Sequence, residues 1–207
     1  MVYYGDGSAD PFVDAPTEEV GIIAPQVVAL IAADVAGDGA ADLLMASATH
    51  PLTAYLNTSA RSYGGKTTTE IPDTIGDARA ITAGDMDNDG DVDVIIGFRN
   101  APNSIAWNNH TVAPFAEATA SDVTADGNNT RAIAVADVNG DGWLDVLAGN
   151  ADQVNRLYLN DGAPALFSAA EGSDITADAD DTRGLALGDL DGDGDLDLFV
   201  CNDGEPD

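Results

Sequence analysis

Residues 85–93 have the sequence Asp-Met-Asp-Asn-Asp-Gly-Asp-Val-Asp, with a carboxylate at every odd position of the nine. The same nine-residue pattern begins again at Asp34, Asp137 and Asp189. Successive copies are 51, 52 and 52 residues apart. Self-similarity at a constant period is typical of repeat architectures. The chain is therefore predicted to contain four repeats of about 52 residues.

The repetition extends beyond these acidic loops, which occupy residues 34–42, 85–93, 137–145 and 189–197. Six residues before the first Asp of each loop stand Val28, Arg79, Arg131 and Arg183. Four residues after the last Asp stand the small residues Ala46, Gly97, Gly149 and Cys201. Because Cys201 takes the place of Gly or Ala, we expect its side chain to be buried.

The fourth repeat stops at Asp207, and its missing half is found at the start of the chain. If Asp207 were followed directly by Met1, residues 2–7 would align with residues 157–162, and Phe12 would align with Phe167. The sequence thus predicts four complete repeats, one of which is divided between the two ends of the chain. Residues 1–207 are expected to form a single propeller domain or segment, with one blade split between the two termini.

Short apolar runs flank each loop, such as residues 132–135 before it and residues 146–147 after it. They are partly β-branched and bounded by Gly and Asp, which indicates strands rather than helices. A third strand is expected at the Leu-Tyr-Leu-Asn element of residues 157–160, and a fourth around Phe115 or Phe167. This pattern predicts an all-β protein, a β-propeller in which each repeat is a blade of short antiparallel strands.

The acidic loops have the chemistry of a calcium site. Side chains at positions 1, 3, 5 and 9 and the backbone carbonyl at position 7 offer oxygen only, and Gly at position 6 allows a sharp turn. Transition metals would favour His or Cys, which these loops lack. The predicted Ca²⁺ ligands are Asp85, Asp87, Asp89, Asp91 and Asp93; Asp137, Asn139, Asp141, Trp143 and Asp145; and Asp189, Asp191, Asp193, Asp195 and Asp197.

The first loop offers Asp34, Asp38 and Asp42 but has Ala36 at position 3, so weak or absent binding is expected there. In the intact loops, uncompensated carboxylates would repel one another or take up protons. Calcium is therefore predicted to be part of the folded state. An EF-hand would need an acidic residue at position 12, where this chain has Ile96, Ala148 and Val200.

These loops, followed by a β run and by Asn-Arg-Leu-Tyr-Leu-Asn-Asp-Gly at residues 155–162, resemble the FG-GAP/VCBS-type repeat. The resemblance covers nearly the whole chain and implies calcium-binding blades like those of integrin α-subunit propellers. It also implies an extracellular or cell-surface location. The pattern departs from that family in having no Phe-Gly pair, and four blades are fewer than such propellers commonly have.

The charge balance excludes some partners. The chain carries 37 Asp and Glu against 7 Lys and Arg, a net charge of −30, which opposes binding to nucleic acid or anionic membranes. Adaptation to high salt and metal ligation both explain this acidity. No stretch approaches the roughly 18 apolar residues of a membrane span. The N-terminus has no signal core, so either the protein is not exported or the signal lies outside this sequence.

The recurring arginines have two interpretations: structural ion pairs, which we favour, or a ring that faces an anionic ligand. His50 and His110 do not recur and are expected in exposed loops, and Trp143 is expected at a loop edge or stacked on a sugar. No nucleophile–base constellation is found, so no enzyme is predicted.

The predicted function is a calcium-binding scaffold for adhesion or for an unidentified protein or carbohydrate ligand. The alternatives are the propeller module of a secreted carbohydrate-active enzyme and a purely structural segment. Its assembly is open among a longer array, a closed four-bladed ring, and self-association of two chains into a larger propeller.

Overall fold

The computed structural model describes residues 2–3, 17–18, 26–57, 68–71, 74, 76–109, 114–115, 120–123, 126–163, 167, 172–175 and 177–204. Within these ranges the chain forms β-strands and no helix, which confirms the all-β prediction. No described segment could cross a membrane as an apolar helix. Phe12 and His110 lie outside the described residues.

Three antiparallel meanders of four strands form the body of the structure, and a two-stranded sheet belongs to each end of the chain. The four-stranded sheets are β3 (Val27–Ala33), β4 (Asp42–Ser47), β5 (Thr53–Tyr55) and β6 (Thr68–Glu70); β7 (Ala78–Gly84), β8 (Asp93–Phe98), β9 (Ser104–Ala106) and β10 (Ala120–Asp122); and β11 (Thr130–Ala136), β12 (Asp145–Asn150), β13 (Arg156–Tyr158) and β14 (Ser173–Asp174). The two-stranded sheets are β1 (Val2–Tyr3) with β2 (Thr17–Glu18), and β15 (Thr182–Gly188) with β16 (Asp197–Asn202).

Each acidic loop joins the first and second strands of its sheet. The third strands fall on the predicted Leu-Tyr-Leu-type elements. The fourth strands, however, do not contain the phenylalanines expected in them. Phe115 and Phe167 lie in turns that precede β10 and β14, where their buried rings pack in the core.

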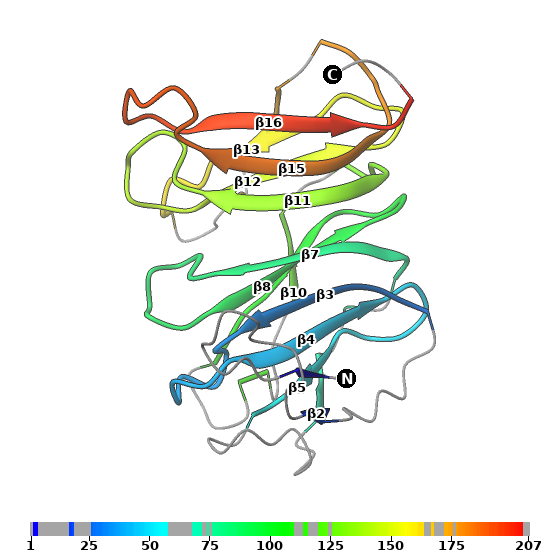
Figure 1. Cartoon of the computed structure of the whole chain (residues 1–207), viewed down its shortest axis with the longest axis vertical. Helices are drawn as coiled ribbons and strands as arrows, with labels where there is room; N and C mark the ends of the chain where they lie inside the picture. Colours follow the sequence, from blue (N-terminus) through cyan, green and yellow to red (C-terminus); the bar gives the residue numbers. More distant parts are fainter. Residues whose placement is uncertain are drawn as a thin grey trace.

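The sheets stack face to face along the long axis of the molecule, as blades do (Figure 1). Their first strands β3, β7, β11 and β15 contact one another in turn and form an inner row. This order brings equivalent positions of successive repeats close together in space.

The hydrophobic core lies between neighbouring sheets. Val94 and Ile96 of β8 belong to the cluster that is shared with the β3–β6 sheet, whereas Ile95 belongs to the cluster shared with the β11–β14 sheet. A strand that is covered on both faces has no polar face, and all six residues of β8 are buried. This explains why the strands after the loops are continuous apolar runs in the sequence.

The small residues after the loops lie where one sheet touches the first strand of the next. A Cβ added to Gly149 would lie 2.7 Å from Cγ2 of Thr182, and one added to Gly97 would lie 2.8 Å from Cγ2 of Thr130. The prediction that Cys201 is buried is wrong in this structure, since its side chain is exposed. Among the described residues no further sheet packs on the free face of β16, where Phe199 is 52% exposed.

The two terminal sheets have the strand registers of different halves of a blade. Val2 pairs with Glu18 in β1–β2, as Leu157 pairs with Ser173 in β13–β14, so the first pair has the register of an outer half. The pair β15–β16 has the register of an inner half, the same as β11–β12. In this structure the halves do not share a sheet and lie at opposite ends of the array (Figure 1), so completion of one blade stays a prediction.

Candidate metal centres

All four acidic loops adopt the same backbone shape. The residues at positions 4 and 6 have positive φ angles, a conformation that favours Gly or Asn. These residues are Gly37 and Gly39, Asn88 and Gly90, Gly140 and Gly142, and Gly192 and Gly194. The sharp turn predicted at position 6 is therefore present in every loop.

The Asp at position 1 fixes this shape by accepting two backbone N–H groups. In the second loop, Oδ1 of Asp85 accepts from Asp89 N at 3.1 Å and Oδ2 accepts from Gly90 N at 3.0 Å. Asp34, Asp137 and Asp189 accept from the same two positions of their own loops. The first loop therefore has the turn of the others even though Ala36 lacks a ligand side chain.

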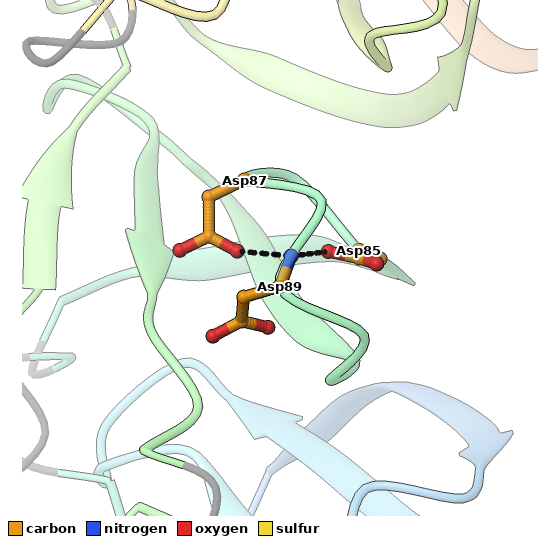
Figure 2. Close-up of side chains that lie close together, drawn as sticks. All are labelled: Asp85, Asp87 and Asp89. Atoms are coloured by element: carbon orange, nitrogen blue, oxygen red, sulfur yellow. Dashed lines mark hydrogen bonds between the residues drawn. The ribbon is translucent and has the colours of Figure 1, made fainter.

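The second loop brings three of its predicted ligands together. Oxygens of Asp85, Asp87 and Asp89 lie within 4.8 Å of one another (Figure 2). The N–H of Asp89 donates to both Asp85 and Asp87, at 3.1 and 3.2 Å. Burial raises the pKa of Asp87, and the neighbouring charge of Asp89 raises it further. Negative charge is thus concentrated at one point of this loop.

The other loops differ in detail. In the fourth loop the cluster consists of Asp189, Asp191 and Asp197. In the third loop Asn139 stands at position 3, and its Nδ2 donates to Oδ2 of Asp141 at 2.9 Å. Among the described residues of the first and third loops, no three carboxylates converge in this way.

At position 7, the amides of Asp91, Trp143 and Asp195 donate to the side chain at position 5. The ring of Trp143 packs on the turn at Gly162, where an added Cβ would lie 2.2 Å from Cε2 of the indole. Trp143 is therefore a packing residue at the edge of its loop. His50 is exposed, as predicted.

The Asp at position 9 is more buried than the other acidic residues of its loop, and it links the loop to the segment that follows the third strand. Asp93 is 1% exposed, and its Oδ2 accepts from Met86 N at 3.0 Å while Oδ1 accepts from Asn108 N at 2.8 Å. Asp42 and Asp145 are fully buried and make the equivalent bonds. The equivalent residue of the fourth loop, Asp197, accepts from Leu190 N at 2.8 Å.

Burial also controls how these carboxyls ionise. Removal from water raises the pKa of Asp93 to about 7, two backbone N–H bonds oppose the rise, and the charges of Asp87 and Asp89 add to it. Burial likewise raises the pKa of Asp42 and of Asp145. A cation at this point would reverse the effect, because it favours the ionised form.

The asparagine that ends the third strand has a role that the sequence did not reveal. Nδ2 of Asn160 donates to Met86 O in the preceding loop at 2.8 Å and to Leu144 O at 3.2 Å. Asn108 makes the same contact with Val35 O of the preceding loop, also at 2.8 Å. Its recurrence 15 residues after the last Asp of each of the first three loops was the available signal. These residues connect successive loops into one row.

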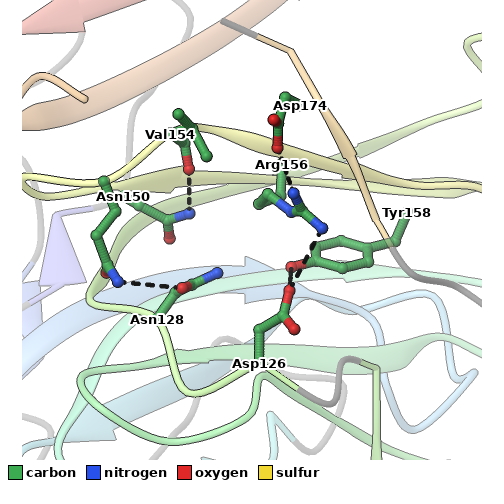
Figure 3. A network of polar contacts seen from close by, with 8 residues as sticks. Asp126, Asn128, Asn150, Val154, Arg156, Tyr158 and Asp174 are labelled. Atoms are coloured by element: carbon green, nitrogen blue, oxygen red, sulfur yellow. Dashed lines mark hydrogen bonds and ion pairs between the residues drawn. The ribbon is translucent and has the colours of Figure 1, made fainter. Parts of the chain in front are cut away.

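A second polar network lies away from the loops, on β13 and β14 (Figure 3). The guanidinium of Arg156 pairs with Asp174 and lies 3.6 Å from Oδ2 of Asp126, which also accepts from the Tyr158 hydroxyl at 3.3 Å. Burial, with the charge of Asp126, raises the pKa of Tyr158. This arginine therefore has a structural role.

The oxygen clusters are suitable for a calcium ion. Their donors are carboxylates and one carboxamide, and the turn is already formed. The Asp at position 9 is buried in the second and third loops and belongs to the cluster itself in the fourth. Calcium accepts six to eight such oxygens in flexible geometry. Among the described residues, the ion pairs of the arginines all lie outside these loops.

The fold and the loops define a class, a blade-forming β-repeat protein with acidic turns. The FG-GAP-like repeat family matches residues 34–96, 87–148 and 137–200. The chain belongs to this family. No curated protein sequence matches the chain.

Two solved structures resemble this chain at low sequence identity, and the first of them supports the fold. BBS1N, in a crystal structure in complex with ARL6DN that was soaked with lead, is 12% identical with a TM-score of 0.53. The match covers 87% of this chain and 52% of that one. The V. cholerae biofilm matrix protein Bap1 is 20% identical with a TM-score of 0.47, over 89% of this chain and 30% of that one. The chain therefore spans about half or less of these structures.

Proposed function

We propose that the protein is a non-enzymatic, calcium-stabilised repeat scaffold in which Ca²⁺ binds the second, third and fourth loops. The observation that carries this proposal is that carboxylate oxygens of Asp85, Asp87 and Asp89 lie within 4.8 Å of one another, in the loop that ends at the buried Asp93. Such a group of carboxylates is unfavourable without a cation. The ion would neutralise the loop and hold its turn.

The predicted ligands remain those at positions 1, 3, 5, 7 and 9. The residue at position 9 also has a structural role, because both oxygens of Asp93 already accept backbone N–H bonds. An ion in front of such a residue would also fix the third strand. Calcium would then stabilise the blade as a whole rather than only the loop.

Adhesion or ligand binding at an extracellular or cell-surface location is part of the same proposal. It is supported by the membership in the FG-GAP-like family and by the stacking of rigid blades, which offers an extended surface. A larger propeller, completed by a second copy or by further blades, would join the outer half β1–β2 to an inner half of the β15–β16 type.

Calorimetric titration of the metal-stripped protein with calcium tests the proposal, together with circular dichroism before and after. Binding of about three ions with a large rise in melting temperature is expected. A titration without heat and an unchanged β spectrum would show that the loops are only turns, and the calcium scaffold would then be abandoned.

A further inference from the structure

The first strand of each sheet contains a β-bulge at an equivalent place. The register shifts between Val27 and Ala29, between Ala78 and Ala80, between Thr130 and Ala132, and between Thr182 and Gly184. The residues inside these bulges are Val28, Arg79, Arg131 and Arg183. A bulge redirects a side chain out of the regular alternation of a strand.

The four bulged residues line one cavity. Its volume is about 320 Å³, and it is formed by side chains from four successive sheets. This volume is at the lower end of the range for small-molecule sites, which is roughly 300–1,000 Å³. The inner row of strands thus places three guanidinium groups and one apolar side chain around a space of ligand size.

The charge in this cavity is opposite to that of the protein. The chain has only 7 Lys and Arg and a net charge of −30, yet three of its arginines converge here. Solvated arginines would be expected to spread over so acidic a surface rather than approach one another. Their convergence concentrates positive potential at a single concave site.

Two of the arginines are oriented by carboxylates that stand just before their own strands. NH2 of Arg79 lies 2.7 Å from Oδ1 of Asp77, and NH2 of Arg183 lies 2.6 Å from Oδ2 of Asp181. In both cases the Asp stands two residues before the Arg. Asp77 also pairs with Arg99, and Asp203 also pairs with Arg183. These two arginines therefore form structural ion pairs, but with an Asp of their own repeat rather than with a neighbouring blade as expected.

Arg131 departs from that arrangement. The residue two places before it is Asn129, which has no charge to offer. Among the described residues no carboxylate forms an ion pair with Arg131, and its Nε is buried without a hydrogen-bond partner. Nε of Arg79 is likewise buried and unpartnered. The cavity thus has a local excess of positive charge.

We propose that this cavity binds a small organic acid of about the size of a monosaccharide, such as a sugar acid. A guanidinium presents paired N–H donors that match the two oxygens of a carboxylate. Arg131 supplies the uncompensated charge, and Arg79 and Arg183 are already oriented by their carboxylates. Val28 provides an apolar wall for the carbon skeleton.

The test uses the whole chain, loaded with calcium and labelled with ¹⁵N in arginine. Glucuronate is titrated while the Nε–H signals are followed, with glucose as the uncharged control of similar size and sulfate as the inorganic anion. Calcium-chelating acids such as citrate are left out because they would strip the loops. Saturable shifts of cavity arginine signals with glucuronate, and none with glucose, are expected.

Variants distinguish binding at this cavity from a general effect of net charge. Arg131→Gln should weaken glucuronate binding about tenfold or more, and Arg131→Lys should restore part of it because it keeps the charge without the planar fork. Arg156→Gln makes the same change of net charge at a residue that does not line the cavity and that pairs with Asp126 and Asp174, so it should leave affinity within about twofold. The calcium stoichiometry of each variant should equal that of the wild type.

Three results would overturn the proposal: equal shifts with glucose, binding of sulfate without glucuronate, or equal losses in the Arg131 and Arg156 variants. If Arg131→Gln fails to fold, the comparison of glucuronate with glucose on the wild-type protein decides. A failure of this test with calcium still bound would leave the calcium scaffold intact, so the two proposals fail separately.

Discussion

The side-chain amide of Asn160 lies 2.8 Å from the main-chain oxygen of Met86, which belongs to the acidic loop of the preceding sheet. The backbone amide of the same residue lies 2.8 Å from Oδ1 of Asp145, in its own loop. One residue therefore ties two successive loops together. The row of loops is part of the packing between sheets rather than a set of separate surface turns.

This connection can be tested with Asn160→Ala. The change leaves the buried acceptor at Met86 without its donor and should lower the free energy of unfolding by about 1–3 kcal/mol. Denaturant unfolding with calcium present measures the loss. Asn57→Ala is the matched control, because within the described part of the chain Nδ2 of Asn57 donates to Ala41 O of its own sheet and to no other sheet. Equal losses in both variants would argue against a link between sheets.

A calcium site should be created in the first loop by Ala36→Asp. Asp34 already accepts the two amides that define the turn, and only the side chain at position 3 is missing. Titration calorimetry should find one more ion than in the wild-type protein. Adding Asp34→Ala to the same variant should abolish the gain. An unchanged stoichiometry for Ala36→Asp would mean that the turn alone does not prepare a site.

The calcium-free protein should become less stable as the pH rises from about 4 to about 7. Asp93 ionises at its ordinary low pH in the unfolded chain, but its pKa is raised to about 7 in the folded protein. The folded state thus holds the proton that the unfolded state has released, so stability falls with pH over that window. Melting temperatures of metal-stripped protein across it measure the slope.

General repulsion among carboxylates acts in the same direction, so a variant is needed to isolate Asp93. Asp93→Asn cannot ionise and should show a shallower decline between about pH 4 and about pH 7. With calcium bound the trend should reverse, because the ion requires deprotonated ligands. Identical slopes for Asp93→Asn and the wild type would assign the whole effect to surface charge.

Gly149→Ala should destabilise the contact between sheets. Its new Cβ would lie 2.7 Å from Cγ2 of Thr182, and such overpacking commonly lowers stability by about 1–3 kcal/mol. Gly188→Ala is the control, since nothing lies within 4 Å of a Cβ added there. Thermal unfolding distinguishes the two. A tolerated Gly149→Ala would indicate that the sheets can separate slightly.

The thiol of Cys201 should react with a thiol-specific reagent in the native, calcium-loaded protein, because its side chain is exposed. The rate should match that of a free thiol peptide and should not require denaturant. Gly149 holds the equivalent place one repeat earlier and is covered by β15. Strong protection of Cys201 in solution would therefore report that another blade packs on β16.

Local patterns in the sequence determined the repeat, the strands and the turn. Asp and Gly at fixed offsets specify the loop because the hydrogen bonds of Asp85 and the positive φ of Gly90 involve only residues of the same nine. The apolar runs specify strands for the same reason. Such features depend on near neighbours along the chain, so spacing alone predicted the loops and the all-β class.

The tertiary structure decided what depends on contacts between repeats. The partner of Asn160 is 74 residues away, and the cavity brings together residues of four sheets. Cys201 is exposed because, among the described residues, no further sheet covers β16. The sequence showed that Arg79, Arg131 and Arg183 recur but not whether they converge. Whether equivalent positions meet depends on how the sheets stack, which the order of residues within one repeat does not specify.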